Sequence, residues 1–99
     1  MIELDQLTPA VFTPLLGEVF NFCGMNVRAE LSLKAVSILG HRRSEALRDP
    51  FSLVFIGPQA LRLPQGIYTV ENATLGTMDI FVTQIGDGGK GSEFEAIFT

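Results

Sequence analysis

The fold is decided by residues 49–85, DPFSLVFIGPQALRLPQGIYTVENATLGTMDIFVTQI, in which three apolar runs are separated by turn signals. The runs span residues 51–56, 67–71 and 77–85, and each is bounded by Pro or Gly. Short apolar runs between such residues are typical of β-strands, because Pro and Gly interrupt regular structure. Short connections favour antiparallel pairing of consecutive strands. The stretch therefore predicts three antiparallel strands in succession.

Within these runs, apolar side chains recur at every second position, as they do on one face of a strand. The first run is expected to be buried on both faces, because its second face, formed by Ser52, Val54 and Ile56, is also largely apolar. In the third run, the face opposite the core carries Thr77, Asp79, Phe81 and Thr83. The positions expected to face a common core are Phe51, Leu53, Phe55, Tyr68, Val70, Met78, Ile80 and Val82.

Residues 8–23 predict a short helix followed by a strand. Thr8 and Pro9 form an N-cap followed by Pro at the first helical position, and Pro14 limits the helix to a short or broken segment that ends at Gly17. The helix would have an apolar stripe of Ala10, Val11, Phe12, Leu15 and Leu16. From residue 18 the pattern changes to alternation, with Phe20 and Phe22 on one side, which predicts a first strand over residues 18–22.

Residues 27–39 permit two interpretations. Apolar residues alternate with polar ones from Val27 to Lys34, as in a strand with one face in water, yet Val27, Leu31, Ala35, Ile38 and Leu39 also satisfy helical spacing. We favour the strand, because the alternation is strict and the neighbouring segments read as strands. The phase slips after Lys34, which predicts a β-bulge near Ala35 and places Val36 and Ile38 at the apolar positions.

The remaining segments complete an all-β pattern. Residues 40–49, GHRRSEALRD, predict a polar surface loop with room for one helical turn over 44–47, and residues 87–91, DGGKG, predict a flexible tip. Residues 92–99 predict a last strand with Phe94, Ala96 and Phe98 inward. We expect one domain over residues 1–99, mainly β, in which a short N-terminal helix precedes about six antiparallel strands that form a small barrel or roll.

Composition bounds the function classes. The chain is 46% hydrophobic with eight Phe, more apolar material than a small monomer needs, which predicts a homo-oligomer or another protein as partner. The net charge of −4 opposes binding to nucleic acid and to anionic membrane surfaces. The acidic start, MIELD, is unlike a signal peptide, and no apolar run is long enough to span a bilayer, so we expect no membrane association and a cytoplasmic location.

Cys23 is the only cysteine, which excludes an internal disulfide and a cysteine-based metal cluster within one chain. We expect it to be a small buried hydrophobe. The phenylalanines at positions 51, 55, 81, 94 and 98 are expected to pack in the core rather than to stack on bases, because they follow strand periodicity without flanking basic residues.

The one local concentration of charge is His41, Arg42, Arg43 and Arg48. Cationic groups this close could hold a phosphate or a carboxylate, although Glu45 and Asp49 partly neutralise them and charged loops are usually solvated. We take these four residues as a candidate contact with a partner protein.

No catalytic residue, cofactor site or metal site is predicted. A nucleophile scheme would need Cys23 or a serine beside His41, and neither lies in a nucleophile motif. Residues 88–91, GGKG, lack the spacing of a phosphate-binding loop and precede a predicted strand rather than a helix. The carboxylates of Asp79, Glu93 and Glu95 fit a solvent-facing surface, so we expect the protein not to be an enzyme.

The strings FSLVFIGP at 51–58, LPQGIYTVEN at 63–72 and LGTMDIFV at 75–82 resemble a family of small bacterial proteins of about this length and of uncharacterised activity. FTPLLGEVF at 12–20 and EAIF at 95–98 match that family's early and final motifs. The resemblance implies an association with genes for phage-tail-collar-like proteins, and so an accessory role in assembly. Many relatives have a His before the Leu-Gly pair, where this chain has Asn72.

Together these observations predict a non-enzymatic protein-interaction or assembly accessory domain with residues 40–49 as its contact, and the resemblance implies a link to a phage-tail-like or surface assembly. The alternative is a small β-barrel that binds an apolar small ligand in its mouth, which would require a cavity of hundreds of Å³ lined by Phe and Leu.

Overall fold

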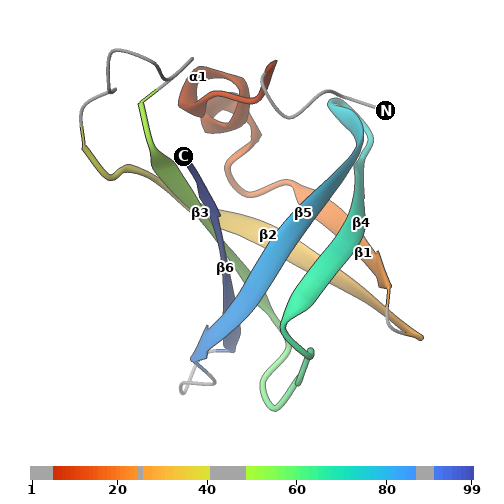
Figure 1. Cartoon of the computed structure of the whole chain (residues 1–99). Coiled ribbons are helices and arrows are strands. Elements are labelled where there is room, and N and C mark those ends of the chain that lie inside the picture. Colours follow the sequence, from red (N-terminus) through yellow and green to blue (C-terminus); the bar gives the residue numbers. More distant parts are fainter. Residues whose placement is uncertain (1–5, 25, 41–48, 87–90) are drawn as a thin grey trace.

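The computed structural model describes residues 6–24, 26–40, 49–86 and 91–99, and this part of the chain has a short helical segment followed by six strands (Figure 1). The elements are α1 (Pro9–Phe12), the 3₁₀ turn η2 (Thr13–Leu15), β1 (Val19–Gly24), β2 (Val27–Ile38), β3 (Phe51–Gly57), β4 (Gly66–Asn72), β5 (Gly76–Gly86) and β6 (Ser92–Phe98).

The six strands form a closed barrel. Their order around the ring is β1-β2-β3-β6-β5-β4, and β1 pairs with both β2 and β4, which closes the ring. Every neighbouring pair is antiparallel. The predicted architecture is therefore confirmed, and the alternative of a roll is resolved in favour of a barrel.

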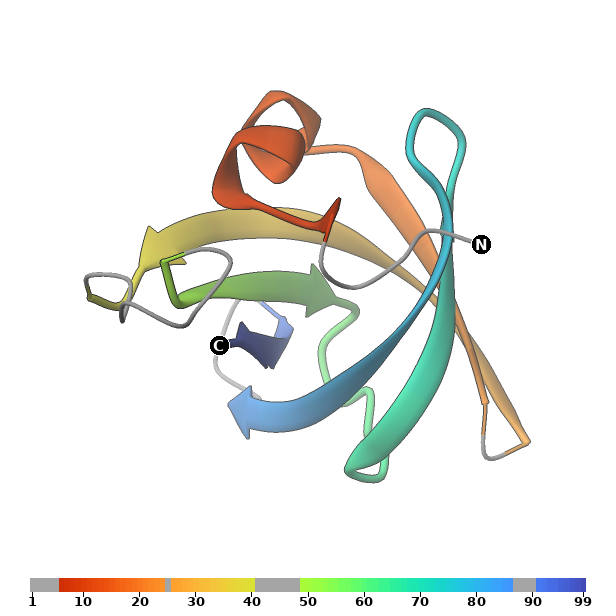
Figure 2. The same ribbon diagram turned by 45° about the horizontal axis from the view of Figure 1, so that its top comes forward.

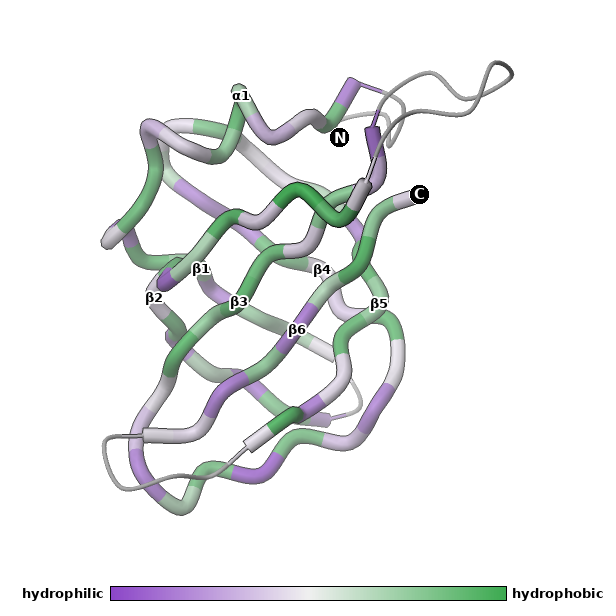
Figure 3. The backbone as a smooth tube through the Cα atoms, turned by 90° about the vertical axis from the view of Figure 1, so that its left-hand side faces the viewer, coloured by the Kyte–Doolittle hydropathy of each residue, from purple (hydrophilic) through white to green (hydrophobic). Residues whose placement is uncertain are grey.

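Side chains at alternate strand positions fill the barrel. The rings of Phe20 and Phe22 pack edge-on against Phe55, with centroids 5.2 and 4.9 Å away, and Phe51 stacks on Phe98 at 4.6 Å. On the second face of β3, Ser52 is buried and Val54 and Ile56 are half-buried, so the prediction of burial on both faces holds in part. Figure 3 shows hydrophobic and hydrophilic residues interleaved along the strands. The buried hydrophobic residues of the strands are Phe20, Phe22, Leu31, Leu33, Phe51, Leu53, Phe55, Tyr68, Val70, Met78, Ile80, Val82, Phe94, Ala96 and Phe98.

The helical segment packs against one end of the barrel (Figure 2). Pro14 has no N–H to continue the α-helix, and the chain tightens into a 3₁₀ turn, which confirms the predicted short, broken helix. Phe12 and Leu15 are buried, and the Phe12 ring lies 6.1 Å from the rings of Phe51 and Phe98.

One expectation for the helical segment was wrong. Ala10 and Leu16 are exposed, because so short a helix turns only one narrow face to the core. Thr8 is the N-cap residue and Pro9 begins the helix, as predicted, although the Thr8 side chain makes no capping hydrogen bond.

β2 is a strand along its whole length, which settles the ambiguity at residues 27–39. The pairing with β3 shifts between Leu33 and Ala35, so the predicted bulge is confirmed. Val36 packs partly against the core, as expected, but Ile38 is 63% exposed, and its predicted apolar placement was wrong. The reason is that β1 pairs with β2 only as far as Ser32, so Ile38 lies on the projecting end of the strand.

Candidate functional site

The predicted contact residues His41, Arg42, Arg43 and Arg48 lie outside the described residues, as does the helical turn considered for 44–47. Among the residues on either side of this segment, the Leu39 N–H donates a hydrogen bond of 2.8 Å to the carbonyl oxygen of Pro50. The connection between β2 and β3 therefore starts and ends at one place, at the same end of the barrel as α1 (Figure 1).

β5 and β6 pair over only a short stretch of their length, and an exposed apolar surface lies beside the unpaired part. Gly76 to Val82 of β5 all pair with β4, but β5 and β6 pair only at Thr83 with Glu95, Gln84 with Phe94 and, after a shift, Gly86 with Glu93. Beyond Thr83 no described residue of β6 pairs with β5, and in Figure 1 the two strands diverge toward the end that carries α1. Among the described residues, Gly76–Val82 of β5 therefore pairs with β4 alone, and its other side forms a strand edge.

A groove of about 410 Å³ follows this divergence, and we call it the β5–β6 groove. Its floor consists of residues that are buried in the core, and its rim consists of exposed apolar side chains, Phe81 at 52%, Ile97 at 57% and Ile67 at 65%. Phe81 and Ile67 are directly paired across β5 and β4. The lining residues are Ile67, Asp79, Ile80, Phe81, Ala96, Ile97, Phe98 and Thr99.

The rim corrects one prediction about the core. Phe81 was grouped with the core phenylalanines, but it lies on the outer face of β5, between the inward-facing Ile80 and Val82. Its position in the alternation, with Thr77, Asp79 and Thr83, is what places it there. The same signal marks Ile97, an apolar residue in phase with Glu93 and Glu95. An apolar residue on an otherwise polar strand face is therefore the sequence feature that could have revealed this groove.

The charge at the β5–β6 groove is acidic. Asp79 is the ionisable side chain in its described lining, and the Thr69 hydroxyl donates a hydrogen bond of 2.7 Å to Asp79 Oδ1. Glu95 lies at the closed end of the groove, opposite Thr83. No Lys or Arg is among the described lining residues, so the site has apolar surface beside negative charge.

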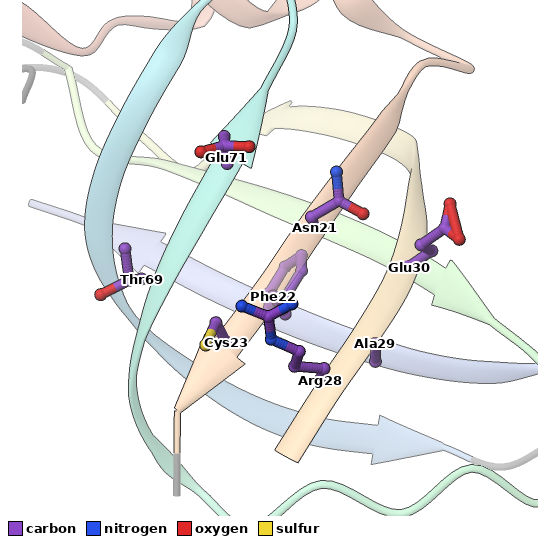
Figure 4. Close-up of a pocket in the computed structure, with 8 residues that line it drawn as sticks. All are labelled: Asn21, Phe22, Cys23, Arg28, Ala29, Glu30, Thr69 and Glu71. Carbon is purple, nitrogen blue, oxygen red and sulfur yellow. The ribbon is translucent and has the colours of Figure 1, made fainter. Parts of the chain in front are cut away.

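A second hollow, of about 760 Å³, lies over β4, β1 and β2 (Figure 4). Cross-strand pairing sets its side chains in two rows: Asn21 stands between Glu71 and Glu30, and Cys23 stands between Thr69 and Arg28. These side chains carry both signs of charge and hydrogen-bonding groups. The described residues include no group of three or more His, Cys, Asp or Glu placed to hold a metal ion.

This hollow corrects the prediction for Cys23. The thiol is exposed rather than buried, because Phe20 and Phe22 take the inward positions of β1 and leave the odd positions facing outward. Strand parity, already visible in the sequence, outweighs the usual preference of cysteine for the interior.

The other polar residues considered from the sequence serve structural contacts. Glu93 forms an ion pair with Lys34 of β2, and Asp79 is held by Thr69. Asn72 accepts hydrogen bonds from the N–H groups of Thr74 and Leu75 at 2.9 and 2.8 Å. Its amide nitrogen donates to the carbonyl oxygen of Val19 at 3.0 Å. Asn72 therefore shapes the β4–β5 turn and ties it to β1.

Tyr68 is a buried ring with a polar contact. Its hydroxyl donates a hydrogen bond to the carbonyl oxygen of Pro64 in the connection before β4. Burial raises the pKa of this hydroxyl.

Comparisons with known proteins give a family without an assigned activity. A family model described as a domain of unknown function, DUF6916, matches residues 7–98. Searches of curated proteins and of solved structures gave no match. In the described part of the chain, no helix has the length and apolar character needed to cross a membrane.

Proposed function

We propose, on the premise that the chain belongs to the DUF6916 family of domains of unknown function, that it is a non-enzymatic domain that binds another protein through the β5–β6 groove. The observation that carries the proposal is a strand edge, Gly76–Val82, that pairs on one side only and borders an exposed apolar rim. An extended segment of a partner can pair with such an edge through its backbone and place alternate side chains in the groove.

The biological process that we propose for this binding rests on the resemblance of the sequence to proteins associated with phage-tail-collar-like genes. An accessory protein of a phage-tail-like or surface assembly would hold an extended segment of an assembly component. Residues 40–49, with His41, Arg42, Arg43 and Arg48, remain a second proposed contact.

Binding of an apolar small ligand in the barrel mouth is less well supported. Phenylalanine and leucine side chains fill the interior, and Phe12 and Leu15 of the helical segment pack over one end of it. The larger polar hollow over β1 lies outside the barrel, where its lining of Asn21, Arg28, Glu30 and Glu71 does not suit an apolar molecule.

The experiment is affinity capture from the host lysate by four tagged forms of the whole chain, the wild type, Ile97→Ser, Val19→Ser and a variant with Arg42 and Arg43 changed to Ala, with native mass spectrometry of what elutes. Ile97→Ser removes an exposed apolar residue from the groove rim, and Val19→Ser is the matched control, an exposed aliphatic residue on the outer face of β1. We expect the wild type and Val19→Ser to retain a stoichiometric partner and Ile97→Ser to lose it while staying folded.

Three outcomes would contradict the proposal. Equal retention of the partner by Ile97→Ser and Val19→Ser would exclude the groove as the binding site. Loss of the partner only on changing Arg42 and Arg43 to Ala would transfer the contact to residues 40–49. Elution of the bare chain with a constant small-molecule mass would favour ligand binding.

A further inference from the structure

The β5–β6 groove also constrains the chemistry of what it binds. Resting on the proposed function, we infer that its ligand is an extended polypeptide segment of another protein in which apolar residues alternate with Lys or Arg, added antiparallel along Gly76–Val82 of β5. Three features of the groove carry this inference: the free edge, the apolar floor and the charge beside it.

The edge of β5 determines how the backbone of the ligand pairs and how long the bound segment is. Among the described residues, Gly76–Val82 of β5 pairs with β4 alone, so we assign the N–H and C=O groups on the other side of β5 to the added strand. A segment of about seven residues matches this edge. Antiparallel addition gives perpendicular, well-aligned hydrogen bonds along it.

The floor of the groove determines which side chains of the ligand can point inward. A strand added beside β5 continues the sheet, so every second side chain of that strand points to the same side as Ile80. That side is apolar, because Ile80, Ala96 and Phe98 form the floor. Burying a charged or polar side chain there would leave it without a partner among these residues. The inward positions of the ligand are therefore apolar.

The outer face of β5 determines which side chains of the ligand are favoured at the outward positions. They would stand beside Thr77, Asp79 and Phe81, the outward residues of β5 along this edge. A Lys or Arg can pair with the Asp79 carboxylate and lay its methylene groups on the Phe81 ring. Glu95 at the closed end and the net charge of −4 add to the preference for cations.

A second copy of this chain fits the groove less well. Two-fold pairing of β5 with β5 of another copy places both Asp79 carboxylates on one face of the joint sheet, where like charges are unfavourable. The two chains, each of net charge −4, would also repel one another. Charge complementarity therefore favours a basic partner segment over self-association at this edge.

The test compares three synthetic peptides of seven residues with blocked ends, titrated into the whole chain by calorimetry at low ionic strength. The first alternates Lys and Val, the second alternates Glu and Val, and the third has the composition of the first with its Lys and Val residues in blocks. We expect the Lys–Val peptide to bind about tenfold more tightly than either of the others, the scale of one or two good cross-strand pairs.

Two charge-neutralising variants locate the effect. Asp79→Asn keeps an oxygen for the Thr69 hydrogen bond and should remove most of the preference for Lys over Glu. Glu30→Gln, the matched control, removes the same charge from β2 and should leave the preference in place.

The outcomes separate this inference from the proposed function. Binding of all three peptides without preference, lost in Ile97→Ser, would overturn the alternating basic ligand and leave the groove as a protein-binding site. If the third peptide, with its Lys and Val residues in blocks, bound as tightly as the alternating one, charge attraction without strand addition would explain the binding. If Glu30→Gln reduced the preference for Lys as much as Asp79→Asn, the attraction would lie elsewhere on the surface. Either result would overturn the inference. Absence of binding by every peptide would overturn it as well, while the capture experiment still decides the proposed function.

Discussion

Gly91, at the start of the last strand, lies against the backbone of β3. A Cβ atom there would be 2.5 Å from the carbonyl oxygen of Gly57, a backbone atom that cannot move without disturbing the β3–β6 pairing. We expect Gly91→Ala to lower the free energy of unfolding by about 2 kcal/mol, as overpacking does elsewhere. Gly86→Ala is the control, because a Cβ there meets nothing within 4 Å, and its effect should stay under about 1 kcal/mol. Chemical denaturation of both variants measures this, and equal losses would contradict it.

Tyr68 gives a prediction about alkaline pH. Because burial raises its pKa, the folded state disfavours the tyrosinate, and the free energy of unfolding should be unaffected below the pKa of an unfolded tyrosine, about 10, and fall as the pH rises beyond it. The chain has one Tyr and no Trp, so tyrosinate absorbance follows this group alone. We expect a titration midpoint above about 10 in the folded chain and a smaller alkaline loss of stability in Tyr68→Phe. A midpoint at the unfolded value would contradict the burial.

Single residues were predictable where strand parity was applied and mispredicted where residue type was used instead. Parity along β1 places Cys23 outward, and parity along β5 places Phe81 outward, although cysteine and phenylalanine both prefer the interior. Residues 41–48, which contain the predicted contact, lie outside the described part of the chain. For them the sequence-based interpretation stays a prediction.

At the scale of elements, β5 has two environments that hydrogen exchange can distinguish. In a strand that is paired on one side only, alternate N–H groups point to the unpaired side. We expect alternate amides of Gly76–Val82 to exchange quickly in the free protein, whereas the amides of β3, which pairs with β2 and β6, should exchange slowly throughout. Exchange followed by NMR residue by residue tests this. Uniformly slow exchange along Gly76–Val82 would mean that the edge is already occupied.

The elements themselves were largely predictable because their periodicity is clear. At β2, strict alternation decided correctly between strand and helix, and the phase slip marked the bulge at Leu33 and Ala35. The exposure of Ile38 was not predictable in this way, because it depends on how far β1 extends beside β2. Such stagger is a property of strand pairs and not of one strand.

The barrel as a whole could be predicted from the sequence, whereas the extent of the groove in its wall could not. Many short strands with tight turns indicate a closed sheet, and the ring closes as expected. The length of the β5–β6 junction depends on the accumulated stagger of all six strands and on the pairing shifts at Leu33/Ala35 and Gln84/Gly86. In the sequence, the groove is indicated only by Phe81 and Ile97, two apolar residues at the outward positions of the strand alternation.

Addition of a strand to the edge of β5 can be followed by amide exchange of the whole chain, residue by residue, with and without a saturating amount of the alternating Lys–Val peptide. We expect the fast-exchanging amides of Gly76–Val82 to become protected, while those of β1 and β2 around the polar hollow do not change. Unchanged exchange along Gly76–Val82 in the bound state, or new protection at Asn21, Cys23 and Glu30 instead, would contradict it.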